Sequence, residues 1–571
     1  MKKLMLTNES IARGAYEAGV SVVSSYPGTP STEITEFISK YDEIYSEWAP
    51  NEKVATEVAV GACIAGARSM CCMKHVGVNV AADPLFTASY TGVNAGMVLV
   101  VADDPAMHSS QNEQDSRFYA RSAHVPMLEP SDSQEAKDFV SLAYKISEEY
   151  DTPVMLRLTT RIAHSQSMVE LGERKQVEKK PYNKDIAKYV MMPVQAIGRH
   201  KVVEAREIRL AEDANTMAIN SVEFRSKKVG IVCAGAVYQY VKEATDASIF
   251  KLGLVYPLPV KAIAEFAKEV DELLVIEELE PFIEDHLKAN GIVCHGKEII
   301  GLQGELNVAT LKEKLYGIVA NKPNAVVPNR PPVLCAGCPH RGVFYVLNKL
   351  KMTVSGDIGC YALGALAPLS AVDTCICMGA SVSMAHGFDK ADERIARKMV
   401  AVIGDSTFMH SGITGLINSV YNKGTSTTII LDNSITGMTG HQDNPTTGKT
   451  IKGEATTKID LVDLVKACGV GSVRVVDAYD LKKVEQIVKE ETAKEEVSVI
   501  IAMRPCILLT KKYPPAFSID SEKCKKCKAC LKIGCPAIEN VGGEIKINKE
   551  LCVACGVCTG LCHFGAIKEG K

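Results

Sequence analysis

Apolar runs of strand length alternate with amphipathic, helix-length segments along most of the chain, which predicts an α/β fold. Near the start, SVVSSYPGTPSTEI predicts a strand, a Pro/Gly turn and a helix capped near Ser31. The runs GMVLVVADDP and TPVMLRLTTR predict further buried strands of a doubly wound sheet. The segment VATEVAVGACIAGAR, which precedes both runs, predicts a helix of small residues that can pack closely on a neighbour or a cofactor.

Breaks in this rhythm divide the chain into predicted domains. Residues 1–165 form a first α/β domain, and 166–225 form a charged connector with a helical part. The strands in KKVGIVCAGAVYQYV, LGLVYPLP and ELLVIEELEP predict a smaller α/β domain over 226–325. A third α/β domain spans 330–510, and Tyr513-Pro514-Pro515 then leads into a short, cysteine-dense domain at 518–571.

Two predicted strands of the third domain end in polar residues. The apolar run in AVIGDS ends in Gly404-Asp405, and the run from Ser426 to Leu431 is followed by Asp432-Asn433. The carboxyl ends of neighbouring parallel strands meet at one edge of the sheet, so Asp405 and Asn433 are expected to face one point. A carboxylate and an amide oxygen suit a hard cation such as Mg²⁺, with diphosphate oxygens completing the octahedron.

Composition narrows the class of protein. The 571 residues carry a net charge of −3, which gives no general attraction to nucleic acid or membrane surfaces. No apolar run approaches the roughly 20 residues that span a bilayer, and MKKLMLTNES lacks the apolar core of a secretory signal. We therefore expect a cytoplasmic protein whose 20 cysteines are reduced thiols or metal ligands rather than disulfides.

Eight cysteines form two runs in the tail, spaced C-x2-C-x2-C-x4-C-P and C-x2-C-x2-C-x3-C. The pattern resembles that of two-cluster bacterial ferredoxins, in which the fourth cysteine of each run ligates the other [4Fe-4S] cluster. The resemblance assigns Cys524, Cys527, Cys530 and Cys562 to cluster 1, and Cys552, Cys555, Cys558 and Cys535 to cluster 2. Zinc is the alternative, but zinc knuckles use pairs of ligands rather than triplets followed by a fourth cysteine.

Four lysines surround the first cysteines of the tail: Lys523, Lys525, Lys526 and Lys528. They form either a solvated basic face or a docking patch for an acidic electron carrier.

The stretch from Gly404-Asp405-Ser406 to Asp432-Asn433 resembles the diphosphate–magnesium motif of thiamine diphosphate enzymes. The resemblance implies that Mg²⁺ binds Asp405, Asn433 and the main-chain oxygen of Ile435. Gly379-Ala380-Ser381 begins a predicted helix, where free N–H groups are expected to bind phosphate. An ordinary strand–turn–helix is the alternative for this motif alone.

Thiamine enzymes also need a glutamate on a different domain, at N1′ of the aminopyrimidine ring. The segment beginning Asn51-Glu52 and continuing as a small-residue helix resembles the segment that carries this glutamate. Glu52 is the candidate. Glu57 is the rival, but it is expected to face solvent or to pack on the helix.

Together these features resemble the 2-oxoacid:ferredoxin oxidoreductases, and among them the family of alpha (large) subunits of indolepyruvate ferredoxin oxidoreductases. The resemblance covers essentially the whole chain. The matching segments are Tyr26-Pro27-Gly28-Thr29-Pro30, Asn51-Glu52-Lys53-Val54-Ala55, Gln114-Asp115-Ser116-Arg117, Cys335-Ala336-Gly337-Cys338-Pro339-His340-Arg341, Met378-Gly379-Ala380-Ser381 and Thr439-Gly440-His441-Gln442.

The resemblance implies pyrimidine-type and diphosphate-type thiamine domains, a transketolase-C-like domain at 226–325 and a ferredoxin-like tail. The implied reaction is oxidative decarboxylation of an arylpyruvate, with coenzyme A accepting the acyl group and ferredoxin the electrons. A smaller beta subunit completes the enzyme in this family, as a heterodimer or an α2β2 assembly.

Three further features concern the candidate site and the remaining thiols. His340 either lies at the thiazolium face or is a histidine satisfied inside a turn, and Thr29 lies in a turn that can face the substrate carboxylate. Cys335 and Cys338 are either packing thiols or part of a third metal site.

The function itself has three alternatives. One is the same reaction on pyruvate, 2-oxoglutarate or a branched-chain oxoacid. The others are an electron-transfer subunit with an inactive thiamine site, and a non-oxidative thiamine decarboxylase. The eight cluster ligands argue against the last.

Overall fold

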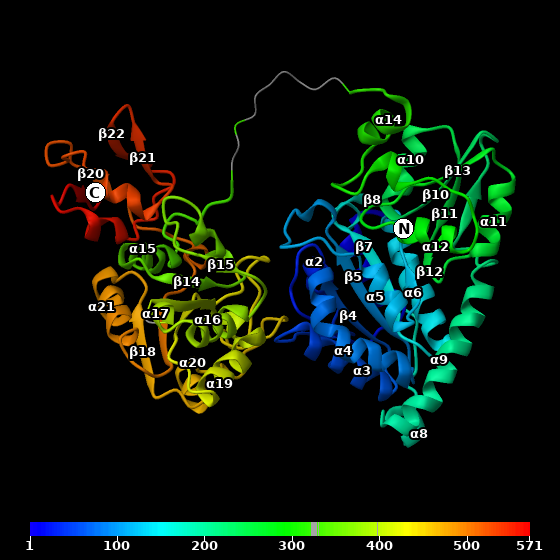
Figure 1. Ribbon diagram of the computed structural model, residues 1–571, viewed down its shortest axis with the longest axis horizontal. Helices are drawn as coiled ribbons and strands as arrows, with labels where there is room; N and C mark the ends of the chain where they lie inside the picture. The colour runs from blue at the N-terminus through cyan, green and yellow to red at the C-terminus, as the bar shows by residue number, and fades with distance from the viewer. Residues whose placement is uncertain (321–327, 329–330, 397, 571) are drawn as a thin grey trace. The chain divides into compact units, whose positions relative to one another are not determined.

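The computed structural model describes residues 1–320, 328, 331–396 and 398–570, and they form two compact units that divide between Ala325 and Val326. The predicted boundary between 325 and 330 falls largely on residues outside the described ranges. Both units contain parallel sheets with helices on both faces, which confirms the predicted α/β class (Figure 1).

The first unit is built on a seven-stranded sheet that is parallel except for one edge strand. Its order is β12 (Leu254–Tyr256), β6 (Met127–Leu128), β7 (Val154–Thr159), β5 (Met97–Asp103), β4 (Ser69–Lys74), β2 (Val22–Ser25) and β3 (Tyr45–Trp48). One face packs against α3 (Glu52–Ile64), α4 (His75–Thr91) and α5 (Ser116–Ala123). The other packs against α1 (Thr7–Glu17), α2 (Thr32–Ile38) and α6 (Ser133–Tyr150).

Alternate residues of each central strand enter the two different cores. In β5, Leu99 and Val101 belong to the α3–α4 core, whereas Val98 and Val100 belong to the α1–α6 core. Both faces are therefore buried, which explains why MVLVVA is a continuous apolar run rather than an alternating one.

The segment predicted as a separate small domain is joined to this sheet. It contains a four-stranded sheet in the order β13 (Glu272–Val275), β10 (Val229–Ala234), β11 (Ser248–Leu252) and β9 (Ser221–Glu223). Its helices are α10 (Gly235–Ala244), α11 (Val260–Lys268), α12 (Phe282–Ala289), α13 (Lys297–Ile300) and α14 (Val308–Tyr316). However, β12 pairs antiparallel with β6, and residues such as Phe250 and Phe266 share the α3–α4 core. The two sheets therefore belong to one compact unit.

The predicted connector is partly ordered against the first unit. β8 (Gln166–Glu170) pairs antiparallel with β1 (Lys2–Leu6), and the long helix α9 (Pro193–Asp213) contacts α4 (Figure 1). The buried Arg206 of α9 donates to the main-chain oxygens of Ser89 and Asp151. The remaining short elements of this unit are η1 (Pro105–Met107), α7 (Thr160–Ala163) and α8 (Ile186–Tyr189).

The second unit contains a six-stranded, fully parallel sheet. Its order is β15 (Thr374–Cys375), β14 (Thr353–Gly356), β16 (Met399–Gly404), β17 (Thr427–Asp432), β19 (Ser498–Met503) and β18 (Ser472–Asp477). α15 (His340–Leu350) and α21 (Leu481–Glu491) cover one face. α16 (Ala380–Ala391), α19 (Ile413–Tyr421) and α20 (Leu461–Ala467) cover the other.

Short elements complete this unit. Around the sheet they are η2 (Cys360–Ala365), α17 (Glu393–Ala396), α18 (Asp405–Thr407), the π-helical turn η3 (Phe408–Gly412) and η4 (Ile507–Leu509). The tail contains two small antiparallel ladders, β20 (Ser518–Ile519) with β23 (Ile567–Lys568) and β21 (Ile538–Val541) with β22 (Glu544–Ile547). Between them lie the 3-10 turns η5 (Ala529–Ile533) and η6 (Val557–Leu561).

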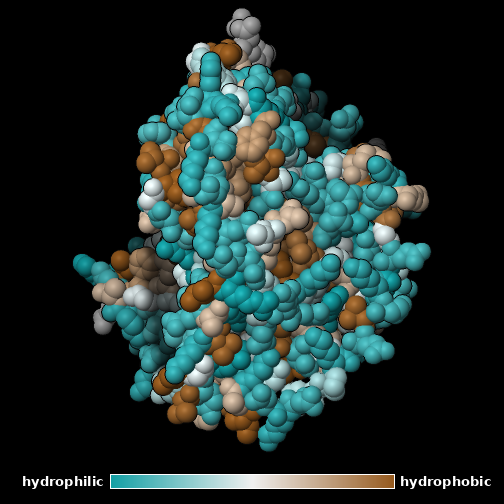
Figure 2. Space-filling view, turned by 90° about the vertical axis from the view of Figure 1, so that its right-hand side faces the viewer, coloured by the Kyte–Doolittle hydropathy of each residue, from teal (hydrophilic) through white to brown (hydrophobic). Residues whose placement is uncertain are grey.

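The surface of the first unit that Figure 2 presents is mostly hydrophilic, with hydrophobic side chains scattered among the polar ones. Within the part of the chain that the structure describes, no helix is both long and apolar enough to cross a membrane.

Candidate functional site

The carboxyl edge of the six-stranded sheet brings Asp405, Asn433 and Ile435 together. Asp405 follows β16, and Asn433 follows the adjacent strand β17, which pairs with β16 in parallel register. One terminal atom of the Asn433 amide lies 3.1 Å from Asp405 Oδ1 and 2.7 Å from the main-chain oxygen of Ile435. The three residues that the sequence pointed to therefore converge on one point.

That amide atom can be nitrogen or oxygen, because the two are exchanged by a simple flip. As nitrogen it donates to both neighbours. As oxygen it completes a group of three acceptors, which needs a bound cation. The main-chain N–H of Ile435 also points to this atom at 3.4 Å, a weak contact that suits oxygen. The oxygen atoms of these three residues therefore fit a hard divalent cation such as Mg²⁺.

The electrostatics of this edge also favour a bound cation. Asp405 is buried, and burial together with the neighbouring Asp432 carboxylate raises the pKa of Asp405 to about 7. Its Oδ2 accepts a hydrogen bond of 3.1 Å from the Thr446 hydroxyl. A divalent cation is the partner that would stabilise the ionised form of such a carboxylate.

The expectation of free N–H groups at Gly379-Ala380-Ser381 is wrong. The Asp357 carboxylate accepts from the N–H groups of Gly379 and Ser381, both at 2.9 Å. The Ala380 N–H donates to the Cys377 oxygen at 3.1 Å. The start of α16 is therefore occupied by a buried side chain, and any role of these three residues toward a phosphate cannot use these N–H groups.

Sequence reasoning assigned no role to Asp357, although a signal was present. Like Asp405, it follows a glycine directly at the end of a largely buried strand, β14. Gly379 has a φ of +84°, and a Cβ there would lie 2.5 Å from the Ser411 side chain. Glycine is therefore required for α16 to begin where Asp357 can hold it.

His340 is buried at the start of α15, edge-on to the Tyr361 ring with 5.8 Å between ring centroids. Burial lowers the pKa of His340 to about 4, so the ring is neutral at pH 7. Tyr361 in turn lies against Gly404, where a Cβ would fall 2.6 Å from the tyrosine ring. His340 is thus one aromatic ring away from the strand end that carries Asp405. Contact with a thiazolium ring stays a prediction.

Ser406 follows Asp405 in α18, and its hydroxyl accepts a hydrogen bond of 2.9 Å from Thr436. This bond ties the turn after β16 to the loop after β17, which carries Ile435.

In the first unit, Glu52 begins α3 at the carboxyl edge of the seven-stranded sheet. The preceding Asn51 caps the helix by accepting from the Val54 N–H at 2.9 Å. Glu52 is buried, and its carboxylate lies against Gly77 of α4. The rival Glu57 is exposed and pairs with Lys53, so burial distinguishes the two glutamates as the sequence predicted.

Thr29 and Lys74 lie at the same edge as Glu52. Thr29 follows β2 and is half-buried, and its main-chain oxygen is 3.5 Å from the Ser109 hydroxyl. Lys74 ends β4 and donates to the Ser109 oxygen at 3.0 Å. Burial lowers the pKa of Lys74, while the carboxylates of Asp104 and Glu52 act against that shift. Sequence reasoning missed Lys74 because a single lysine after an apolar strand has no distinguishing pattern.

The matching segment Gln114-Asp115-Ser116-Arg117 forms part of a buried ion network. Arg117 pairs with Asp115 at 2.6 Å and with Glu277 at 2.5 Å. Since Glu277 follows β13, this network ties the first sheet to the second and has a structural role.

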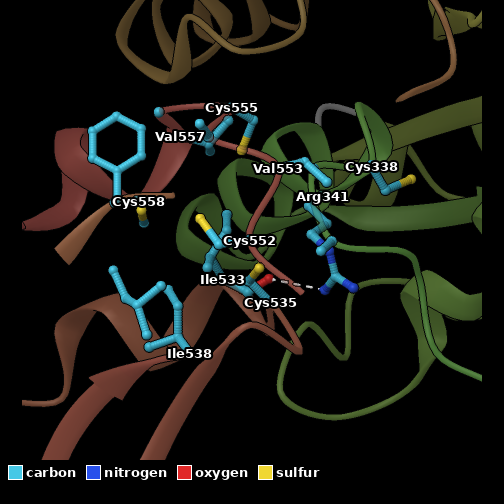
Figure 3. A pocket seen from close by; sticks show the side chains of 16 residues that line it. Cys338, Arg341, Ile533, Cys535, Ile538, Cys552, Val553, Cys555, Val557 and Cys558 are labelled. Carbon is cyan, nitrogen blue, oxygen red and sulfur yellow. Dashed lines mark hydrogen bonds between the residues drawn. The ribbon is translucent and has the colours of Figure 1, made fainter. Parts of the chain in front are cut away.

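The tail cysteines line two separate cavities. The Cys524 cavity contains the thiols assigned to cluster 1, and the Cys552 cavity contains those assigned to cluster 2 (Figure 3). In each cavity the fourth cysteine comes from the other run: Cys562 in the first and Cys535 in the second. Each cavity therefore contains three cysteines of one run and the fourth cysteine of the other, as the crossed ligand pattern predicts.

No group of three His, Cys, Asp or Glu side chains in the described residues converges closely enough to hold a single metal ion. A four-iron cluster does not need its ligands to converge on one metal position, because its thiolates are spaced around a cube of iron and sulfide. The cavity lining fits this arrangement, and the tail clusters stay a prediction.

The two cysteines of the Cys335–Cys338 pair lie in different environments. Cys338 is buried and lines the Cys552 cavity, which agrees with a packing role, whereas Cys335 is exposed. Two distant thiols, Cys360 and Cys506, lie within electrostatic reach of Cys335, and burial raises the pKa of Cys360 to about 11. The tertiary structure thus places thiols near the pair that sequence spacing did not reveal.

Comparison with known proteins identifies the class. Residues 13–229 match the family described as pyruvate flavodoxin/ferredoxin oxidoreductase, thiamine diphosphate-binding. Residues 357–502 match the C-terminal thiamine pyrophosphate-binding domain of thiamine pyrophosphate enzymes. Both matches describe thiamine diphosphate-binding domains, and they indicate an oxidoreductase.

Full-length relatives identify the family within this class. The chain is 40% identical to the indolepyruvate oxidoreductase subunit IorA of Archaeoglobus fulgidus, over 100% of this chain and 98% of the relative. It is 38% identical to the subunit of the same name from Pyrococcus horikoshii, with the same coverage. A 2-oxoglutarate synthase subunit KorA of Methanothermobacter thermautotrophicus is 27% identical over 30% of this chain and 48% of the relative. The chain belongs to the family of indolepyruvate oxidoreductase IorA subunits.

Proposed function

We propose that this chain is the catalytic and electron-relaying subunit of an indolepyruvate:ferredoxin oxidoreductase. The reaction is oxidative decarboxylation of arylpyruvates, namely indolepyruvate, phenylpyruvate and hydroxyphenylpyruvate. Coenzyme A takes the acyl group to give aryl-acetyl-CoA, CO₂ leaves, and ferredoxin takes the electrons. The observation that carries the proposal is that the second unit contains both an oxygen-lined strand edge and two four-cysteine cavities.

Asp405, Asn433 and the main-chain oxygen of Ile435 are the proposed Mg²⁺ ligands that anchor the diphosphate of the cofactor. Gly404 and Ser406 shape the turn around them. Thiamine diphosphate, when bound, supplies the carbon nucleophile and the electron sink for decarboxylation. Glu52 is proposed to exchange a proton with N1′ of its aminopyrimidine ring. Burial at a helix start suits this role, because solvent is kept away from the carboxyl group.

The Cys552 cavity is proposed to receive electrons first. It borders Cys338 and Arg341 beside His340, and His340 leads through Tyr361 to the strand end at Gly404. The Cys524 cavity is lined only by tail residues and includes the exposed Lys525 and Lys528. This arrangement supports exit of electrons from cluster 1 to an external ferredoxin.

The substrate and the assembly rest on the relatives. Six full-length relatives carry the name indolepyruvate oxidoreductase subunit IorA, a name that implies a second subunit. We therefore propose a cytoplasmic heteromer with a smaller beta subunit. Thr29 and His340 are the proposed contacts to the substrate carboxylate and the thiazolium ring.

The test is anaerobic co-expression with the beta subunit, followed by analysis of thiamine, magnesium, iron and sulfide. CoA-dependent viologen reduction should be faster with indolepyruvate and phenylpyruvate than with pyruvate or 2-oxoglutarate. Glu52→Gln should lower the rate by about a hundredfold or more, and the exposed Glu57→Gln should stay near the wild-type rate. Faster turnover of pyruvate would reassign the substrate, and aldehyde formation without acyl-CoA would indicate a non-oxidative decarboxylase.

The cluster ligands have a separate test. Cys535→Ala should disturb the cluster of the second run, although Cys535 belongs to the first run. Iron analysis with EPR would show a defect confined to one cluster. Zinc in place of iron in the wild-type protein would refute both clusters. If Asp405→Ala left the complex fully active, the chain would be an electron-transfer subunit with an inactive thiamine site.

A further inference from the structure

Arg341 is a buried cation whose hydrogen-bond acceptors are all neutral. Its side chain lies near the start of α15, and the residue is only 4% exposed. The guanidinium donates to four main-chain oxygens: Cys335 at 3.0 Å, Ile533 at 3.3 Å, and those of Leu334 and Gly534. Within the described residues, the hydrogen bonds of this guanidinium all end on neutral main-chain oxygens, and none ends on a carboxylate.

A buried charge without an opposite charge is unfavourable, so its presence indicates a negative partner. Arg341 lines the Cys552 cavity (Figure 3). The thiols of Cys535 and Cys555 lie within electrostatic reach of the guanidinium, and both belong to the proposed ligands of cluster 2. A cluster held by four thiolates in this cavity would supply the missing negative charge.

Among the described residues that line it, the Cys524 cavity has no comparable buried cation. The positive residues of the Cys524 cavity are Lys525 and Lys528, and both are exposed. Water and salt screen the charge of exposed lysines, whereas a buried guanidinium acts at low dielectric. The two cavities therefore differ in electrostatic environment although their cysteine spacing is nearly the same.

We infer that Arg341 is a positioning residue that raises the reduction potential of the cluster in the Cys552 cavity and leaves the other cluster unchanged. One-electron reduction adds a negative charge to the cluster without making or breaking a bond. A fixed positive charge stabilises the reduced form more than the oxidised form, which raises the potential. The inference rests on the clusters of the proposed function.

The carbonyl bonds of Arg341 explain how the charge is held in place. Ile533 and Gly534 lie between the last two cysteines of the first run, and Gly534 has a φ of +68°. A Cβ at Gly534 would lie 3.2 Å from the guanidinium, so this glycine lets the tail backbone approach it. The same side chain therefore secures the Cys535 loop and places the charge beside it.

The experiment is a potentiometric titration of the co-expressed complex, with each cluster followed by EPR. The cluster whose signal is lost or altered in Cys527→Ala is cluster 1. Arg341→Gln should shift the midpoint of cluster 2 downward without shifting that of cluster 1. Lys526→Gln is the matched control, because Lys526 is an exposed cation near cluster 1 that should leave both midpoints unchanged.

Equal midpoints for cluster 2 in Arg341→Gln and the wild type would overturn the inference, as would a similar shift of both clusters. If Arg341→Gln loses cluster 2, Arg341→Lys decides: a wild-type midpoint supports the role of the charge, and a lowered midpoint refutes it. The iron and sulfide content of the wild-type protein distinguishes a failure of the proposed function from a failure of this inference. Absence of clusters would refute the proposed function, whereas intact clusters with unmoved midpoints would refute only this inference.

Discussion

Gly77 lies so close to Glu52 that a Cβ at Gly77 would fall 2.7 Å from the Glu52 carboxylate oxygen. The absence of a side chain on α4 therefore allows the carboxylate at the start of α3 to occupy its place. This relationship gives a test of the Glu52 assignment that leaves the glutamate itself unchanged.

Gly77→Ala should displace the Glu52 carboxylate and reduce the rate of decarboxylation by about a hundredfold, because a shift near 1 Å is enough to disturb catalytic geometry. Steady-state kinetics with indolepyruvate measures the loss. The control is Gly61→Ala on α3, where an added Cβ meets no atom within 4 Å. A wild-type rate in Gly77→Ala would show that the position of Glu52 is not critical.

Asp405→Asn tests the proposed cation site through stability. Without a cation, the buried carboxylate beside Asp432 is unfavourable, so its neutralisation should stabilise the metal-free protein by on the order of 1 kcal/mol. The same change should abolish the stabilisation that Mg²⁺ and thiamine diphosphate together provide. Thermal unfolding with and without these ligands measures both effects.

Asp432→Asn is the comparison for that experiment. It removes the neighbouring negative charge but not a proposed ligand, and it should keep the ligand-dependent rise in Tm. If Asp405→Asn retained the full rise in Tm with Mg²⁺ and cofactor, the ligand assignment would be refuted.

Glu278 should make the first unit less stable at higher pH. Burial raises the pKa of Glu278 to about 7, and its carboxylate accepts from the Leu306 N–H at 2.8 Å. The folded state therefore holds a proton that the unfolded state releases near the ordinary pKa of 4.5. Stability from this group is present below pH 4.5 and is lost as pH rises through about 7, at a cost of at most about 3 kcal/mol.

Glu278→Gln should remove this contribution and increase stability at pH 8 relative to the wild type, with little change at pH 4. Urea unfolding at several pH values measures the difference. An identical pH dependence in the wild type and the variant would contradict the assignment of this proton to Glu278.

The tail lysines should affect docking of ferredoxin but not the chemistry. Lys523, Lys525 and Lys528 are exposed beside the Cys524 cavity. Replacing all three with glutamate should raise the KM for an acidic ferredoxin by about tenfold or more, and most strongly at low salt. Viologen reduction, which needs no docking surface, should be unchanged. The exposed Lys466→Glu on α20 controls for a charge reversal away from the tail. An unchanged KM in the triple variant would show that the lysines are only a solvated face.

Patterns among residues that are close along the chain were enough to predict much of the fold and of the candidate site. Asp405 and Asn433 could be paired because they end apolar runs separated by one helix, and adjacent parallel strands present their carboxyl ends at one edge. The resemblance of the Asn51-Glu52 segment, with the small-residue helix behind it, indicated Glu52 over Glu57, whereas the cap at Asn51 was visible only in the structure. The spacing of the two cysteine runs indicated two four-cysteine sites, because such spacing is a local property of the chain.

The tertiary structure decided contacts between residues that are distant along the chain. Spacing could not reveal that Asp357 occupies the N–H groups at Gly379 and Ser381, because the two segments meet only when β14 packs beside α16. Nor could spacing reveal that β12, which belongs to the predicted 226–325 domain, pairs with β6 of the seven-stranded sheet. Likewise, only folding brings Gly77 against Glu52 and Arg341 against the Cys535 loop. Side-chain period and spacing describe neighbours along the chain, whereas these contacts depend on how packed layers bring distant backbone together.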